Sequence, residues 1–269
     1  MITHQIYRAL RIGIVFLFIS GILAPLIYAV WLSFSPDSFL TPPGNEWSLR
    51  WYRAFVTDDR WMMALSRSII LGLACACLAL FAATTLAYSM ERYHFRGKGS
   101  LGILVLLPLC IPHAVLGMGL LPLFYISGLW GGMIGLVLVH AMICLPVVYL
   151  MVRDKLRRID PDLEAAARGL GAKPSQVTGR ILLPLWGSTL AVGFVAAFAI
   201  SFNESMVTLF LATPTTETLP AIVWPQLRYA PSPLVAVASV ASVIVALVVA
   251  MAFGWVVKLV GAKSLTKKG

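Results

Sequence analysis

Charged residues are scarce in this sequence. Asp, Glu, Lys and Arg make up 12% of its 269 residues, whereas soluble domains average about 25%. Hydrophobic residues make up 59%, more apolar surface than a soluble fold of this length could bury. The composition therefore excludes a soluble domain and predicts a membrane protein.

Cysteine is also scarce, and its four positions suggest no chemistry. Cys75, Cys77, Cys110 and Cys144 all fall inside apolar runs. None has neighbours of the zinc-ligand type, and Cys75-Ala-Cys77 lacks the two-residue spacer of a redox pair. We interpret all four as small buried hydrophobic residues and expect no metal site and no catalytic residue.

A phosphate-binding loop is missing as well. The nearest match is Gly97-Lys98-Gly99-Ser100, but Arg92 occupies the place of the earlier glycine and the segment is a short turn between apolar runs. We therefore expect no ATPase within this chain.

Six apolar runs are long enough to cross a bilayer, which takes about 20 residues. The first run follows Arg8 and Arg11 like a signal peptide, but it is too long and no cleavage site follows it, so we expect a retained anchor. The sequence predicts an all-α membrane protein with six transmembrane helices. The runs are Ile12–Phe34, Ser68–Met90, Leu101–Ile126, Met133–Val152, Trp186–Leu211 and Leu234–Val257.

The net charge of +10 could suggest nucleic acid as a partner, but its distribution indicates membrane topology instead. Five of the 21 Lys and Arg fall on one side of the predicted spans: Arg50, Arg53, Arg60, Arg67 and Arg228. Cytoplasmic loops carry the excess of Lys and Arg, so both termini and the polar interval Arg153–Leu185 are expected in the cytoplasm. The sixteen on that side are Arg8, Arg11, Arg92, Arg96, Lys98, Arg153, Lys155, Arg157, Arg158, Arg168, Lys173, Arg180, Lys258, Lys263, Lys267 and Lys268.

A short helix is predicted inside this cytoplasmic interval. Asp160 can cap its start, Pro161 suits the first helical position, and Asp162 favours the positive end of the helix. Gly169 or Gly171 is expected to end it.

The predicted helix is amphipathic. Glu164 and Arg168 are spaced for an i, i+4 pair. One interpretation is an interfacial helix lying on lipid. The other is a helix that fits a groove on a soluble partner, because Ala165, Ala166 and Ala167 would permit close approach. The apolar stripe consists of Leu163, Ala166, Ala167 and Leu170.

The same interval resembles the EAA loop of ABC importer permeases. An alanine-rich start precedes Gly171, and Ile181-Leu182-Leu183-Pro184 begins ten positions after it. The wider resemblance, over about residues 68–257, is to the spermidine/putrescine (polyamine, opine and phosphonate) subfamily. Further motifs that carry it are Leu107-Pro108, Ile111-Pro112, Leu145-Pro146, Ser201-Phe202-Asn203-Glu204 and Thr218-Leu219-Pro220.

The resemblance implies a MetI-like type I ABC importer permease fold, with residues 1–269 as a single transmembrane permease domain of the bacterial inner membrane. It implies alternating-access import without enzymatic activity in this chain. Implied partners are a second permease in a heterodimer, two ATPase subunits that bind ATP and Mg, an extracytoplasmic solute-binding protein and the lipid bilayer, with no nucleic acid. The implied ATPase-coupling residues are Leu163, Glu164, Ala165, Ala166, Ala167, Arg168, Leu170, Gly171 and Ala172.

One position departs from the family motif. The motif carries its glutamate six residues before the glycine, where this chain has Ala165, and Glu164 stands one residue earlier. Either Glu164 serves from a rotated position or the loop docks without that carboxylate.

Glu204 is the one carboxylate well inside a predicted span. A charge near the centre of a membrane helix costs about 2.5–3.5 kcal/mol on insertion scales, so Glu204 is expected to line the substrate path, with Asn203 and His113, or to make an interhelical hydrogen bond. Polyamine permeases commonly have an acid at the position of His113, which argues against a polycation. A polyamine or related amine leads, with an opine, an aminophosphonate or another small ion as alternatives.

Two other classes of protein remain as alternatives. A stand-alone secondary transporter or channel would show internal repeats and charged pairs within its spans. A membrane-embedded enzyme would cluster its chemistry, whereas His113, His140 and Glu204 fall in three separate runs.

Overall fold

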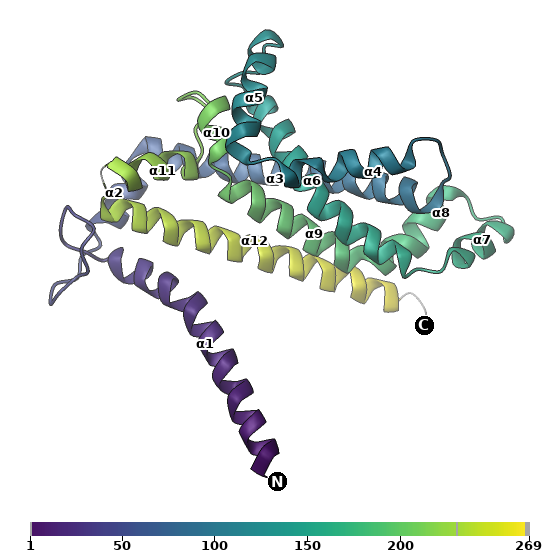
Figure 1. The fold of residues 1–269 in the computed structure, drawn as a ribbon, viewed down its shortest axis with the longest axis horizontal. Helices are drawn as coiled ribbons and strands as arrows, with labels where there is room; N and C mark the ends of the chain where they lie inside the picture. The colour runs from purple at the N-terminus through teal and green to yellow at the C-terminus, as the bar shows by residue number, and fades with distance from the viewer. Residues whose placement is uncertain (1, 230, 267–269) are drawn as a thin grey trace. The chain divides into compact units, whose positions relative to one another are not determined.

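The computed structural model describes residues 2–229 and 231–266, and every regular element among them is a helix (Figure 1). The prediction of an all-α protein is therefore confirmed. The chain forms two compact units, Met1–Met62 with Val223–Ile244 and Met63–Ile222 with Val245–Gly269. Each is described by itself.

The first unit contains α1 (Ile2–Leu32), α2 (Arg50–Thr57), most of α11 (Leu219–Tyr229) and the start of α12 (Pro233–Thr266). The apolar part of α1 is unburied, as expected for a helix that faces lipid. The Ser33 hydroxyl lies 2.7 Å from the Tyr52 hydroxyl and ties the end of α1 to α2.

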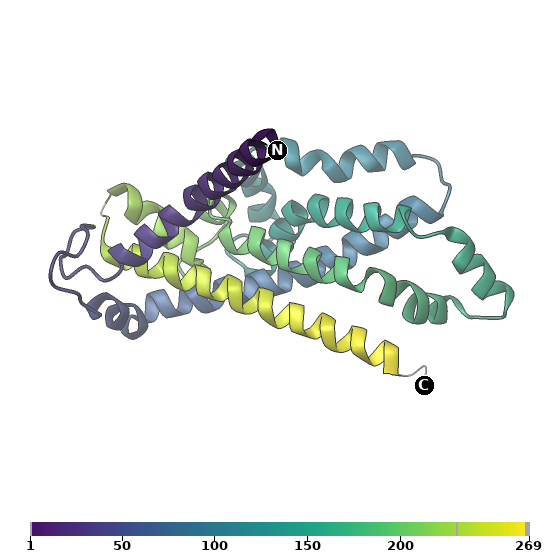
Figure 2. The same ribbon diagram turned by 90° about the horizontal axis from the view of Figure 1, so that it is seen from below.

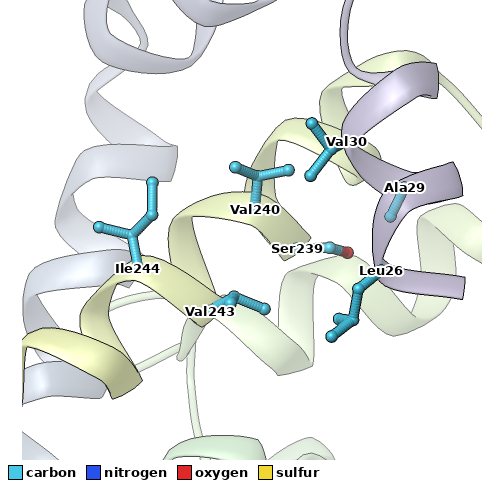
Figure 3. A pocket seen from close by; sticks show the side chains of 7 residues that line it. All are labelled: Leu26, Ala29, Val30, Ser239, Val240, Val243 and Ile244. Atoms are coloured by element: carbon cyan, nitrogen blue, oxygen red, sulfur yellow. The ribbon is translucent and has the colours of Figure 1, made fainter. Parts of the chain in front are cut away.

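A small apolar pocket of about 150 Å3 lies between α1 and α12 within this unit (Figure 3). Leu26 and Val30 line it from α1, and Val240 and Val243 from α12. The hydroxyl of Ser239 donates to the Val235 carbonyl of its own helix at 2.9 Å. The pocket therefore presents only apolar surface.

The second unit is built on helices that pack through small side chains. In Figures 1 and 2, α6 (Met133–Arg157) and α9 (Leu183–Asn203) run side by side. Most of α3 (Asp59–Arg92) belongs to the same core. Residues such as Ala79, Ala83 and Ala197 are fully buried there, which lets helix backbones approach closely.

The cysteine prediction is half right. Cys75 and Cys144 are buried in this core with their sulfur atoms 3.6 Å apart. Cys77 and Cys110 are exposed instead, because they lie on the outer faces of their helices.

The described residues include five helices long and apolar enough to cross a membrane, or six if one bent pair counts as a single span. Their ends extend beyond most of the predicted boundaries, since polar residues continue the helices past the apolar runs. The five are Leu10–Leu32, Asp59–Arg92, Met133–Arg157, Pro174–Asn203 and Pro233–Trp255.

The third predicted span, Leu101–Ile126, is a sharply bent pair of helices. It consists of α4 (Lys98–Leu106) with the 3-10 turn η1 (Leu107–Cys110), followed by α5 (His113–Ile126), and the two parts meet at 109°. The cause is Pro112, because a residue before proline avoids the helical region and Ile111 is extended at φ −99° and ψ 124°.

The fifth predicted span, Trp186–Leu211, is also interrupted. The helix α9 ends at Asn203, and a separate helix α10 (Met206–Leu211) follows. Glu204 lies between them with an extended backbone, at ψ 117°. It therefore stands at a helix break and not inside a helix.

The cytoplasmic placement of both termini stays a prediction from the charge distribution. Lys267 and Lys268, which contribute to that distribution, lie outside the described residues, as do the side chains of Lys258 and Lys263.

Candidate functional site

The predicted cytoplasmic helix is present as α7 (Pro161–Gly169), followed by α8 (Pro174–Val177) and a π-helical turn, η2 (Thr178–Leu182) (Figure 1). Asp160 caps α7 as predicted, since its Oδ1 accepts from the Asp162 amide at 2.9 Å. Gly171 closes the other end at φ +86°, where the Gly171 amide donates to the Arg168 carbonyl at 2.9 Å and the Ala172 amide to the Ala167 carbonyl at 3.0 Å. This is a Schellman motif, so both ends of α7 are fixed by local chemistry.

The burial of α7 is inverted relative to its sequence pattern. Leu163 is 50% exposed and Leu170 is 91% exposed, while the charged Glu164 is 1% exposed. Ala165 and Ala166 are exposed as well. Three residues of the predicted apolar stripe, Leu163, Ala166 and Leu170, are therefore exposed and Ala167 is half-buried, while the carboxylate faces inward.

Arg92 explains how a carboxylate can be buried there. Its Nε donates to Glu164 Oε1 at 2.6 Å, and its Nη2 donates to the carbonyls of Leu156 and Ile159 at 3.3 and 3.0 Å. The Tyr88 hydroxyl donates to Glu164 Oε2 at 2.9 Å. The guanidinium of Arg92, at the end of α3, thus contacts both α7 and the C-terminal end of α6.

The predicted pair between Glu164 and Arg168 is confirmed. Arg168 Nη2 lies 3.8 Å from Glu164 Oε2, and Arg168 Nε donates to the Glu164 carbonyl at 3.2 Å. Arg92 and its bonds to Glu164, Leu156 and Ile159 are called the Arg92 joint below. The neighbouring residue Glu91 also connects α3 to α6: its Oε1 accepts from Arg153 Nε at 2.6 Å and from Arg157 Nε at 3.1 Å. The ends of α3 and α6 are therefore tied twice.

A second cluster forms where the two broken helices meet. His113, the first residue of α5, bonds Glu204 through its Nδ1. The other carboxylate oxygen of Glu204 accepts from the Val207 amide at 3.0 Å, in the first turn of α10. The side chain of His113 is 38% exposed and that of Glu204 is 7% exposed, so the imidazole is the more accessible partner.

The helices α5 and α10 pack closely next to this pair. A Cβ atom added at Gly117 would lie 2.9 Å from Phe210 Cδ2 and 3.2 Å from Val207 Cα. Only glycine permits this approach, which holds α5 against α10.

His140 of α6 bonds both sides of the break at Glu204. Its Nδ1 lies 2.9 Å from Ser201 Oγ in α9, and its Nε2 lies 3.1 Å from Thr208 Oγ1 in α10. All three residues are buried. The imidazole thus bridges the two halves of the interrupted span.

Among the predicted substrate-path residues, the structure brings Glu204 and His113 together, and their bond is the interhelical contact named as one alternative. Asn203 is exposed, and its Nδ2 donates to the Ala199 carbonyl of its own helix at 2.8 Å, so it does not join the pair. No group of three or more His, Cys, Asp or Glu side chains in the described part of the chain could hold a metal ion.

Arg92, Tyr88 and His140 were not predicted as site residues. Tyr88 and Arg92 share an i, i+4 spacing at the end of α3, which places them on one face, but nothing in the local pattern identifies Glu164 as their partner. His140 is a polar residue within an apolar run, which is the signal that could have marked it.

These features define a multi-span membrane protein: two spans are interrupted, at Pro112 and at Glu204, and a well-formed helix between spans exposes an apolar face. The comparisons identify the family. A profile of the binding-protein-dependent transport system inner membrane component matches residues 76–263, and the chain belongs to this family. It is therefore a transport component and not an enzyme, and the secondary-transporter and enzyme alternatives are not favoured.

Curated relatives include the putrescine transport system permease protein PotI of Escherichia coli (strain K12), 30% identical over 231 residues that cover 83% of this chain and 82% of PotI. The spermidine/putrescine transport system permease protein PotC of the same organism is 28% identical over 251 residues, covering 92% and 94%. The predicted resemblance is confirmed.

Solved structures share the fold. A bacterial alginate ABC transporter in complex with an alginate pentasaccharide-bound periplasmic protein aligns at a TM-score of 0.73 and 16% identity, covering 96% of this chain and 95% of that chain. The MetNI methionine ABC transporter aligns at 0.60 and 19% identity, covering 76% and 99%. The fold is that of MetI-like ABC importer permeases, as predicted.

Proposed function

We propose that this chain is the permease subunit through which a type I ABC importer moves a small organic amine into the cytoplasm, with Asp160–Ala172 as its coupling segment. The observation that carries the proposal is the inverted burial of α7, which exposes Leu163 and Leu170 and buries Glu164.

The exposed face of α7 suits a groove on a separate ATPase subunit. Leu163, Ala166 and Leu170 are exposed and share one face of the helix at i, i+3 and i+7 spacing, the kind of surface that a helix presents to a groove. Glu164 is engaged with Arg92, so docking proceeds without this carboxylate. ATP and Mg are bound by the partner, and movement of α7 passes through the Arg92 joint to α3 and α6.

The other proposed partners follow from the type of transporter. They are a second permease chain, two ATPase subunits and an extracytoplasmic binding protein. In support, the structurally similar alginate transporter was solved with a periplasmic protein bound. The family description also names binding-protein-dependent transport.

An amine is the substrate class that the site supports best. PotI is a putrescine permease and PotC a spermidine/putrescine permease by name. In this chain Glu204 supplies a carboxylate at the helix break, and this carboxylate is bonded to His113, the more exposed of the two side chains. We propose that a substrate ammonium group competes with the His113 imidazole for Glu204, as charge-assisted hydrogen bonds favour an ionised partner.

The test is ATP hydrolysis by the reconstituted complex with its binding protein. Putrescine, spermidine, an opine and an aminophosphonate are supplied in turn. The proposal predicts that a polyamine stimulates hydrolysis most strongly. Stimulation by the opine or the aminophosphonate alone contradicts the substrate class, and hydrolysis that never depends on the permease contradicts the coupling role.

A further inference from the structure

We infer that His140 is a positioning residue that holds the two halves of the broken fifth span and thereby sets the place of Glu204. The inference deepens the proposed function, because it assigns a support to the same site. The hydrogen-bond partners of His140 are Ser201 and Thr208, so its effect on Glu204 passes through these two residues.

The hydrogen bonds indicate which atoms donate and which accept among His140, Ser201 and Thr208. When Thr208 Oγ1 donates to the Glu204 carbonyl at 3.4 Å, its oxygen accepts from Nε2 of His140 at 3.1 Å. Nδ1 then accepts from the Ser201 hydroxyl at 2.9 Å. In this arrangement both nitrogens of a neutral imidazole have a hydroxyl partner.

The position of the group explains its effect. Ser201 precedes Glu204 by three residues and Thr208 follows it by four, so the two hydroxyls lie on opposite sides of the break. The regular backbone ladder is interrupted there, because α9 ends at Asn203 and α10 starts at Met206. The ring of His140, which is 1% exposed and belongs to α6, bonds α9 and α10 directly across the gap.

The competing explanation is a histidine that only fills space in the core. Such a residue would affect the stability of the whole unit evenly, whereas a positioning residue affects the segment around the break. Burying an imidazole whose two nitrogens both find partners also avoids the penalty for unsatisfied polar groups in an apolar interior. The two roles therefore predict different locations for the loss of local stability when the imidazole is removed.

Three substitutions separate the bonds. His140→Gln keeps a donor near the place of Nε2 for Thr208, His140→Asn keeps an acceptor near the place of Nδ1 for Ser201, and His140→Leu keeps neither. Each is made in the assembled complex. Two quantities are measured: amide hydrogen exchange over residues 202–209 against residues 190–200, and the concentration of putrescine, with binding protein present, that gives half-maximal ATPase stimulation.

The inference predicts that His140→Leu speeds exchange over residues 202–209 by about tenfold or more relative to residues 190–200, and raises the half-maximal concentration severalfold. His140→Gln and His140→Asn are expected to lie between His140→Leu and the wild type. Unchanged exchange in His140→Leu, or equal acceleration in both segments, overturns the inference. Normal transport in Glu204→Gln instead overturns the proposed role of Glu204, and the exchange result still decides the role of His140.

Discussion

Arg92 and Glu164 lie 72 positions apart in the sequence and meet at 2.6 Å in the fold. The pair fixes α7, the proposed coupling segment, to the end of α3, and the same guanidinium donates to two carbonyls near the end of α6. One side chain therefore connects α7 to two membrane helices.

Removing the cation of this pair should be costly. Arg92→Met leaves Glu164 buried without its closest partner, and breaking a buried pair typically costs about 3–5 kcal/mol. The double variant Arg92→Met/Glu164→Leu should regain most of that loss, since replacing both partners by apolar groups is often close to neutral. Thermal unfolding of the purified protein measures both effects.

The matched control is Arg158→Met. Arg158 pairs with Asp154 at 2.9 Å, but both side chains are mostly exposed, and exposed pairs contribute about 0–1 kcal/mol. If Arg158→Met lowers stability as much as Arg92→Met does, burial of the Arg92–Glu164 pair gives it no larger contribution to stability than an exposed pair.

Two nearby glycines should respond to alanine with opposite signs. Gly171 has φ +86°, a left-handed conformation that costs a residue with a Cβ about 1–2 kcal/mol. Gly169 is the last residue of α7 with open space around its Cα, so Gly169→Ala should be neutral or stabilise the helix by up to about 1 kcal/mol. Stability and co-purification of the ATPase are measured for both variants. Equal behaviour of the two variants would argue against the Schellman end of α7.

A second glycine pair tests the packing of α5 on α10. Gly117→Ala places a methyl group 2.9 Å from Phe210, and overpacking of this kind costs about 1–3 kcal/mol. Because the shift would separate His113 from Glu204, uptake should fall as well. Gly119→Ala, two positions along in the same helix, meets nothing within 4 Å and should match the wild type; loss of uptake in both variants would point to α5 in general and not to this contact.

Glu204→Gln tests the substrate path. It keeps the shape and an oxygen that accepts the hydrogen bond from the Val207 amide but removes the carboxylate. A hydrogen bond to a charged group is worth about 1.5–3 kcal/mol, or about 10- to 100-fold in substrate affinity. Uptake should fall while assembly with the partner subunits persists. Glu46→Gln, at an exposed position, is the control and should leave uptake unchanged. Unaltered transport kinetics in Glu204→Gln would contradict a role of Glu204 in the substrate path.

The sequence was sufficient for the features that depend on local chemistry. Apolar length identified the membrane helices, and Asp160 with Pro161 identified the start of α7. The break at Pro112 was foreseeable as a kink, but its 109° angle depends on how α5 packs against α10. The break at Glu204 has neither proline nor glycine beside it, so no local signal marked it.

The inverted burial of α7 was the larger gap. Its periodicity identifies an apolar face but not whether that face is covered by the same chain or by another one. Glu164 is buried because Arg92 and Tyr88 arrive from α3, and contacts between distant segments leave no trace in a pattern of neighbouring residues.

We propose that the exposed face of α7 contacts an ATPase subunit. A photo-crosslinking amino acid at position 170, where Leu170 is 91% exposed, tests it directly, and position 104, where Leu104 of α4 is 63% exposed, is the control. If α7 docks on an ATPase subunit, position 170 gives an ATPase adduct and position 104 gives none. A complex that hydrolyses ATP but gives no ATPase adduct from position 170 would contradict it.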